Sequence, residues 1–118
     1  MRILVVDDDR PTRTGLSELL AEAGYDVTSA DSFDDAANIL RTTPPDLLIT
    51  DIRLDGRNGL QLLLKSSIPV PAIVLTGFDD SVLEAHARGE GAVYMVKPVT
   101  VEQLLDQVQT MIGAGPRD

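Results

Sequence analysis

The chain of 118 residues contains no cysteine, and this absence removes several kinds of chemistry at once. Without thiols there is no disulfide framework, no thiolate metal site and no cysteine nucleophile. Basic residues are also scarce, because 10 lysines and arginines stand against 19 aspartates and glutamates, for a formal net charge of −9. Negative charge opposes nonspecific binding to DNA and anionic lipid, so we expect no direct contact with nucleic acid or membrane.

Long apolar runs are missing as well. The first one, ILVV, is followed at once by three aspartates and is too short for a signal-peptide core or a membrane span, so we expect a cytoplasmic protein. The length suffices for one packed core and not for a second domain. We assign residues 1–113 to this domain, and residues 114–118 to a C-terminal tail or the beginning of a linker, because that end is rich in glycine and proline.

Short apolar segments recur at nearly even intervals along the chain. They predict five strands: ILVV at 3–6, YDVTS at 25–29, DLLIT at 46–50, AIVLT at 72–76 and AVYMV at 92–96. The segments between them have helical periodicity, as in the set Leu60, Leu63 and Leu64. Helix boundaries are indicated by Pro11, Ser32, the capping box of Thr100 and Gln103, and the C′ glycines Gly24 and Gly89.

This alternation predicts the α/β class, specifically a (βα)₅ doubly wound fold with a five-stranded parallel sheet and right-handed crossover helices on both faces. The segments at 3–6, 46–50 and 72–76 are apolar throughout, which is typical of central strands. The segments at 25–29 and 92–96 alternate or carry tyrosine, which favours edge positions. The expected strand order is therefore the flavodoxin-like order 2-1-3-4-5.

Polar side chains lie at the carboxyl ends of four of the five predicted strands. They are Asp7 and Asp8, Asp51, Thr76, and Lys97 with Pro98 after it. Ligands of open α/β sheets bind outside the carboxyl ends of the strands, so one pocket can hold all of these side chains.

Three converging carboxylates repel each other unless a cation neutralises them. The ligands are oxygens, and the single histidine, His86, is distant in the chain, so Mg²⁺ or Mn²⁺ is favoured over Zn²⁺. A lysine and a threonine can bind phosphoryl oxygens, and a carboxylate beside them can form an aspartyl phosphate.

The motifs VVDDD, LLITD, VLTG and YMVKP, in this order and spacing, resemble the response-regulator receiver family of two-component signal transduction over essentially the whole chain. The resemblance implies that Asp51 accepts a phosphoryl group from a phosphohistidine of a sensor histidine kinase or a histidine phosphotransfer protein. It also implies that Asp8, Asp51 and the backbone carbonyl of Arg53 bind Mg²⁺, and that Asp7 reaches the metal through water.

The same resemblance assigns further roles. Thr76 and Lys97 would bind the phosphoryl oxygens, Tyr94 would change rotamer together with Thr76, and a cis peptide bond would precede Pro98 and direct Lys97 toward the site. The expected function is a phosphorylation-activated switch rather than an enzyme. Its phosphorylation would change affinity for a downstream protein or a fused output domain, and the resemblance allows a homodimer through the fourth helical segment, the fifth strand and the last helix.

The sequence departs from the family pattern after the acceptor. Asp55 stands where a proline is usual and Asn58 where an acidic residue is common, which affects the loop before the third helical segment. By the same resemblance, Arg53 and Phe78 match variable positions that flank the acyl phosphate in relatives, where the side chains alter its lifetime.

Other functions remain as alternatives. One is a degenerate receiver that binds protein partners without phosphorylation. A second is a haloacid-dehalogenase-like phosphatase, since Asp7 and Asp9 form a D-x-D pattern, but this leaves Asp51 without a role and no acidic pair follows Lys97 in the required place. A P-loop ATPase has still weaker support, because LLITD could be a Walker B strand but the chain lacks G-x-x-x-x-G-K-[ST].

Overall fold

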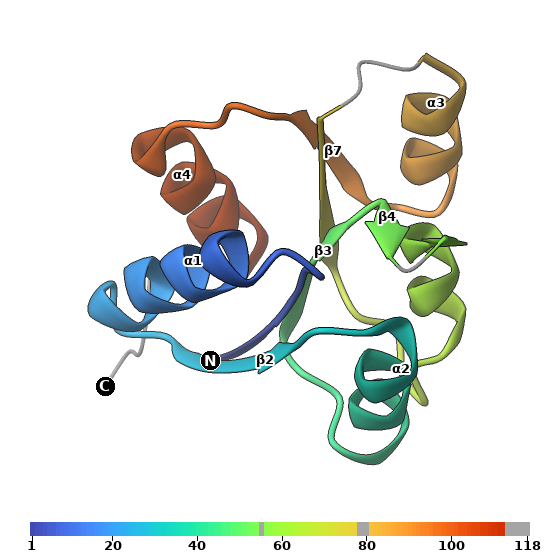
Figure 1. The fold of residues 1–118 in the computed structure, drawn as a ribbon, viewed down its shortest axis with the longest axis horizontal. Helices are drawn as coiled ribbons and strands as arrows, with labels where there is room; N and C mark the ends of the chain where they lie inside the picture. The colour runs from blue at the N-terminus through green and yellow to red at the C-terminus, as the bar shows by residue number, and fades with distance from the viewer. Residues whose placement is uncertain (55, 78–80, 113–118) are drawn as a thin grey trace.

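A five-stranded parallel sheet forms the centre of the molecule, with strand order β2-β1-β3-β6-β7 (Figure 1). The computed structural model describes residues 1–54, 56–77 and 81–112. In this sheet, both ends of each of the five strands lie within one residue of the predicted segment. The edge strands are β2 and β7. The strands are β1 (Arg2–Val6), β2 (Asp26–Ala30), β3 (Leu47–Asp51), β6 (Ala72–Thr76) and β7 (Val93–Val96). The predicted doubly wound α/β class and the order 2-1-3-4-5 are confirmed.

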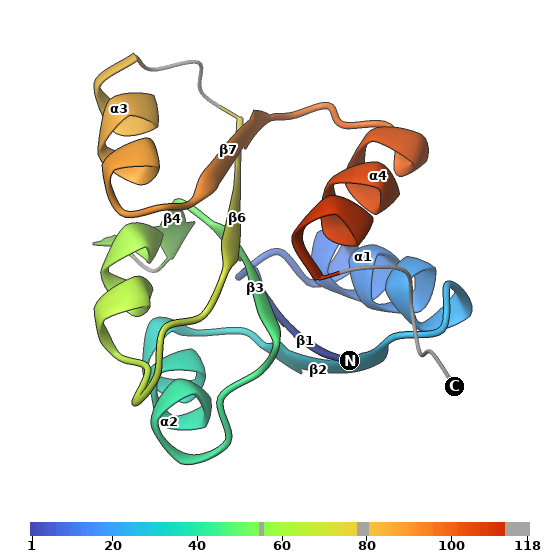
Figure 2. The same cartoon turned by 180° about the vertical axis from the view of Figure 1, so that it is seen from behind.

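Helices cover both faces of the sheet (Figures 1 and 2). One face is covered by α1 (Arg10–Glu22) and α4 (Val101–Ile112), and the other by α2 (Phe33–Thr42), the 3₁₀-helix η1 (Gly59–Leu64) and α3 (Ser81–Gly89). Successive strand residues point to opposite faces, so Ile3 and Val5 join the core under α1 and α4. Leu4 and Val6 join the core under α2 and η1. Burial on both sides fixes the strands, and with them the side chains at their carboxyl ends.

The ends of the helices follow most of the predicted signals. Pro11 lies in the first turn of α1, and Ser32 caps α2 by accepting the backbone N–H of Asp35 at 3.2 Å. Before α4, Thr100 and Gln103 exchange backbone-to-side-chain hydrogen bonds of 2.9 and 3.1 Å, as the capping box predicts.

Two glycines were predicted to end helices, and one of these predictions is wrong. Gly24 follows α1 with a φ of 100°, a left-handed conformation that glycine adopts without strain. Gly89, however, is the last residue of α3, and the left-handed residue after this helix is Gly91, with a φ of 80°. The end of the helix therefore lies two residues later than predicted, and the sequence alone did not show which of the two glycines adopts the left-handed conformation.

The segment after β3 differs most from the prediction. Arg53–Leu54 (β4) and Arg57–Asn58 (β5) form a short antiparallel hairpin that was not predicted from the sequence, although the Asp-Gly pair between them in the sequence is a common turn signal. The third helical segment is the 3₁₀-helix η1, in which Leu64 is 73% exposed rather than part of an apolar face with Leu60. A 3₁₀-helix has about three residues per turn, so residues four apart no longer share a face.

Within the described residues, no helix has the length and apolar character needed to cross a membrane. Residues 113–118 lie outside the described part of the chain, so the predicted boundary at residue 113 stays a prediction.

Candidate functional site

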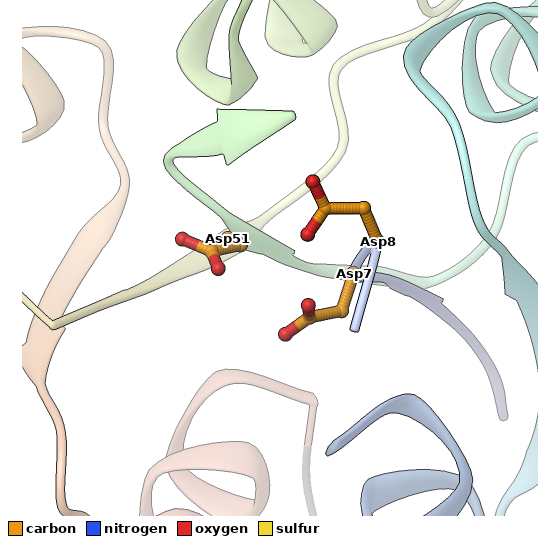
Figure 3. A group of neighbouring side chains, drawn as sticks. All are labelled: Asp7, Asp8 and Asp51. Carbon is orange, nitrogen blue, oxygen red and sulfur yellow. The ribbon is translucent and has the colours of Figure 1, made fainter. Parts of the chain in front are cut away.

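Three carboxylates meet at the carboxyl edge of the sheet (Figure 3). Asp7 and Asp8 directly follow β1, and Asp51 is the last residue of the adjacent strand β3. One oxygen from each of the three residues lies within 4.8 Å of the other two. Their exposure differs, since Asp7 is buried, Asp51 is intermediate and Asp8 is exposed. The cluster is therefore open to solvent on the side of Asp8.

Lys97, which directly follows the edge strand β7, contacts this cluster. Its Nζ lies 3.4 Å from Asp51 Oδ2 and 3.5 Å from Asp7 Oδ2, so a single ammonium group contacts two of the carboxylates. The backbone N–H of Lys97 donates to the carbonyl oxygen of Thr76 at 2.7 Å, which connects the ends of β7 and β6. The peptide bond between Lys97 and Pro98 is cis, as the resemblance implied.

The environment of the Asp7 carboxyl group shifts its pKa. Its side chain is only 3% exposed, and this burial raises its pKa above the ordinary value. The backbone N–H of Asp9, which donates to Asp7 Oδ1 at 2.9 Å, and the positive charge of Lys97 both lower the pKa, while the negative charge of Asp51 raises it further. The net shift is upward, so the effect of burial is larger than that of the N–H and of Lys97, and the charged form of Asp7 is disfavoured.

Both carboxylate oxygens of Asp51 have an interaction partner. The backbone N–H of Arg53 donates to Oδ1 at 3.3 Å, and Lys97 contacts Oδ2. The side chain of Asp51 is 19% exposed, which leaves it accessible to a reactant from solvent. A carboxylate that is oriented and accessible in this way is suited to act as a nucleophile.

The donor set fits a hard divalent cation. It consists of carboxylate oxygens from two adjacent strand ends, with no sulfur and no imidazole in the group. Such oxygen ligands match Mg²⁺, and also Mn²⁺, better than Zn²⁺. A cation at this place would relieve the repulsion that a single lysine only partly offsets.

Thr76 and Tyr94 lie on the neighbouring strands. Thr76 is fully buried at the end of β6. Tyr94 pairs with Val74, two residues before Thr76, so the side chains of Tyr94 and Thr76 point to the same face of the sheet. This arrangement is compatible with a coupled movement of the two residues, but their switch roles stay predictions.

The positions that flank the acceptor are only partly described. Arg53 is exposed at the start of the hairpin, beside Asp51. Phe78 and Asp55, to which the sequence assigned effects on phosphoryl lifetime and on the loop, lie outside the described residues. The modulating roles of Arg53 and Phe78 therefore stay predictions.

Two residues near the site were not identified from the sequence. Arg13 of α1 donates from Nη1 to the carbonyl oxygen of Asp7 at 2.9 Å, which ties the helix to the end of β1. Gly59 packs directly against the carbonyl group of Asp51. Neither contact has a sequence signal, because each depends on how segments distant in the chain approach one another.

Known proteins with similar sequences support a family assignment. The sequence model of the response regulator receiver domain family matches residues 3–109 of this chain. The chain is 36% identical over 117 residues to the response regulator MprA of Mycobacterium avium, covering 95% of this chain and 51% of that protein. It is 30% identical over 116 residues to the transcriptional regulatory protein PdtaR of Mycobacterium tuberculosis, covering 95% of this chain and 57% of that protein. The chain thus spans about half the length of these curated relatives.

A solved structure agrees with this comparison. A response regulator receiver domain protein from Clostridium thermocellum superimposes with a TM-score of 0.85 at 29% sequence identity, covering 94% of this chain and 93% of that one. The sheet order, the acidic cluster and the match over residues 3–109 lead to the same conclusion. The chain belongs to the response regulator receiver domain family of two-component systems.

Proposed function

We propose that this chain is a Mg²⁺-dependent switch in which Asp51 accepts a phosphoryl group from the phosphohistidine of a sensor histidine kinase or a histidine phosphotransfer protein. Receiver domains are in general signalling switches rather than enzymes, and response regulators receive their phosphoryl group from histidine kinases. The observation that carries the proposal for this chain is the position of Lys97 Nζ, which contacts Asp51 within the acidic cluster.

Phosphoryl transfer requires the protein mainly to position Asp51 and to neutralise negative charge. A carboxylate oxygen of Asp51 attacks the phosphorus atom, and the bond between phosphorus and the histidine nitrogen breaks. The histidine keeps the electron pair of that bond, and the carboxylate becomes an acyl phosphate. The N–H of Arg53 orients Asp51 for this attack, and Lys97 lies where it can bind an incoming phosphoryl oxygen.

Receiver domains generally bind Mg²⁺, and the carboxylates here fit such an ion. Asp8, Asp51 and the backbone carbonyl of Arg53 would hold it, and Asp7 would contact it through water. When bound, the ion neutralises negative charge on the carboxylates and on the phosphoryl group. Lys97 supplies a second positive charge on the opposite side of Asp51 from the Arg53 N–H.

The output of the switch is a changed affinity for another protein. The new phosphoryl group recruits the hydroxyl of Thr76, and Tyr94 moves into the space this leaves, which alters the surface formed by α3, β7 and α4. A downstream protein, a fused output domain or a second copy of the chain would bind to this surface. Slow hydrolysis of the acyl phosphate resets the switch.

Intact mass after incubation with Mg²⁺ and acetyl phosphate tests the proposal. We expect one added phosphoryl group on the wild-type chain, and none with EDTA or in Asp51→Asn. Asp106→Asn is the matched control, because it removes the same charge from an exposed position on α4. Labelling that persists in Asp51→Asn would disprove the acceptor assignment, and no labelling under any condition would favour the degenerate, phosphorylation-independent receiver.

The phosphatase alternative has little support in the geometry. It requires the second carboxylate of the D-x-D pattern, Asp9, to face the reaction. Instead Asp9 is the N-cap of α1, and its side chain accepts the backbone N–H of Thr12 at 3.1 Å.

A further inference from the structure

The hairpin that follows Asp51 is attached to this residue at both of its ends. At its start, the N–H of Arg53 donates to Asp51 Oδ1 at 3.3 Å. At its end, Gly59 packs against the Asp51 carbonyl group, and its N–H donates to the carbonyl oxygen of Ile52 at 2.6 Å. The position of the hairpin backbone and the position of the acceptor are therefore directly linked.

This hairpin is too short to be stable by itself. Each of its strands has two residues, with Arg53 paired to Asn58 and Leu54 to Arg57. Isolated two-stranded hairpins are marginal in water even when they are longer. Leu54 is buried in the core, so one side of the hairpin is anchored by apolar contact. The returning strand, β5, continues into η1, where Asn58 accepts the backbone N–H of Leu60 at 2.8 Å, and a second contact from β5 would fix the other end of this strand.

Arg57 supplies this contact. Its Nη1 lies 2.7 Å from Asp34 Oδ1, and the centre of its guanidinium group lies 3.9 Å from the centroid of the Phe33 ring. Phe33 is the first residue of α2 and is only 2% exposed, so its ring is a fixed platform. One side chain thus joins β5 to the beginning of α2, 23 residues earlier in the chain.

The two contacts together require an arginine. A guanidinium group is planar, so it can lie on an aromatic ring and still direct an N–H toward a carboxylate at its edge. A lysine can form the ion pair with Asp34, but its ammonium group lacks the flat surface that stacks on Phe33. The orientation of Arg57 is consequently fixed at two points rather than one.

From this geometry we infer that Arg57 is a positioning residue for the metal site, which it supports by clamping the hairpin to Phe33 and Asp34. Arg57 contacts neither Asp51 nor the acidic cluster in any interaction found among the described residues. It acts through the backbone of Arg53, its near neighbour across the hairpin. The inference depends on the proposed function, because the Arg53 carbonyl is an expected ligand of Mg²⁺.

The size of the effect follows from how often the hairpin is correctly placed. The apparent affinity for a ligand falls in proportion to the fraction of molecules in the binding conformation. The ion pair is exposed and the cation–π contact involves a half-exposed arginine, so each is weak. Their combined loss shifts the docking equilibrium of the hairpin by about fivefold, which is the upper limit for the decrease in Mg²⁺ affinity. Simple electrostatics predicts the opposite sign, because removing a positive charge near the site strengthens cation binding.

Titration of the full chain with MgCl₂, followed through the backbone amide NMR shifts of Asp51 and Ile52, separates these effects. We expect Arg57→Ala to bind Mg²⁺ more weakly than the wild type, by up to about fivefold. Arg57→Lys keeps the charge and loses the stacking, so we expect a smaller decrease of up to about twofold. Arg88→Ala is the matched control, since it removes an arginine from an exposed ion pair of the same 2.7 Å length, with Glu84 on α3. We expect its Mg²⁺ affinity to equal that of the wild type.

A second variant tests whether the contacts act as one unit. Asp34→Asn should weaken Mg²⁺ binding, and the double variant with Arg57→Ala should be no weaker than Arg57→Ala alone. Melting temperatures serve as the structural readout. Arg57→Ala loses a cation–π contact that Arg88→Ala does not, so we expect it to melt slightly lower, with both variants fully folded at the temperature of the titration. Unchanged or tighter Mg²⁺ binding by Arg57→Ala, or equal weakening by Arg88→Ala, would overturn the inference while leaving the proposed function intact. A wild-type chain that does not bind Mg²⁺ would overturn the proposed function itself.

Discussion

Replacement of Gly59 by alanine tests whether the acceptor backbone is held by close packing. A Cβ atom at this position would lie 3.1 Å from Thr50 Oγ1 and 3.2 Å from the carbonyl carbon of Asp51, and it would overlap with the carbonyl oxygen of Asp51. The overlap is with backbone atoms, so a side-chain rotation cannot relieve it. Either the end of β3 or the beginning of η1 has to move.

The expected cost can be stated from this geometry. Overpacking of a tightly packed interior destabilises proteins by about 1–3 kcal/mol. For a domain of this size, each kcal/mol lowers the melting temperature by about 4 °C. We therefore expect Gly59→Ala to melt about 4–12 °C below the wild type. The atoms that have to move belong to Asp51, so we also expect slower phosphorylation by acetyl phosphate.

The chain offers a matched control in Gly15. This residue lies within α1, and a Cβ atom there would meet no other atom within 4 Å. Alanine is favoured over glycine in helices by about 0.5–1 kcal/mol, so Gly15→Ala should melt about 2–4 °C above the wild type. Thermal unfolding followed by circular dichroism measures both variants. A Gly59→Ala protein that melts at or above the wild-type temperature would refute the packing argument.

Three further predictions concern charge, capping and metal binding. Burial raises the pKa of Asp7 above its ordinary value of 3.8. Between pH 3.8 and the folded pKa, the folded state therefore retains a proton that the unfolded chain has lost. The free energy of unfolding, measured in EDTA, consequently falls as the pH rises from 3.8 through the folded pKa. Asp7→Asn should therefore unfold at higher urea concentration than the wild type at pH 7 and converge with it toward pH 3.8, and parallel pH profiles would contradict this. Thr100→Ala removes the capping box of α4 and should cost about 1 kcal/mol in urea denaturation, whereas Thr110→Ala in the same helix should cost less than half of that. Asp8→Asn should weaken Mg²⁺ binding in the NMR titration, while Asp106→Asn should not; equal affinities would remove Asp8 from the site.

Much of the fold could be predicted because its signals are local. The apolar runs of β1, β3 and β6 are long enough to identify central strands, and the alternation in β2 and the tyrosine in β7 identify the edges. Once the order of parallel strands is known, their carboxyl ends must lie side by side. The convergence of Asp7, Asp8 and Asp51 follows from that order.

The predictions failed where two distant segments determine the local conformation. The repeated leucines after Gly59 are compatible with an ordinary α-helix, but the segment forms a 3₁₀-helix that leaves Leu64 exposed. The hairpin of β4 and β5 was missed as well. The Asp-Gly pair in its sequence is a turn signal, but strands of two residues are too short to show an alternating apolar pattern.

The sequence by itself determined the alternation of strands and helices, the sheet order and the types of side chain at the site. Those properties follow from the pattern of apolar residues, which acts over a few neighbouring positions. The tertiary structure alone decided that Lys97 lies between Asp7 and Asp51, and that Arg57 stacks on Phe33. Contacts of this kind depend on the approach of segments far apart in the chain, and only packing of the whole domain fixes that approach.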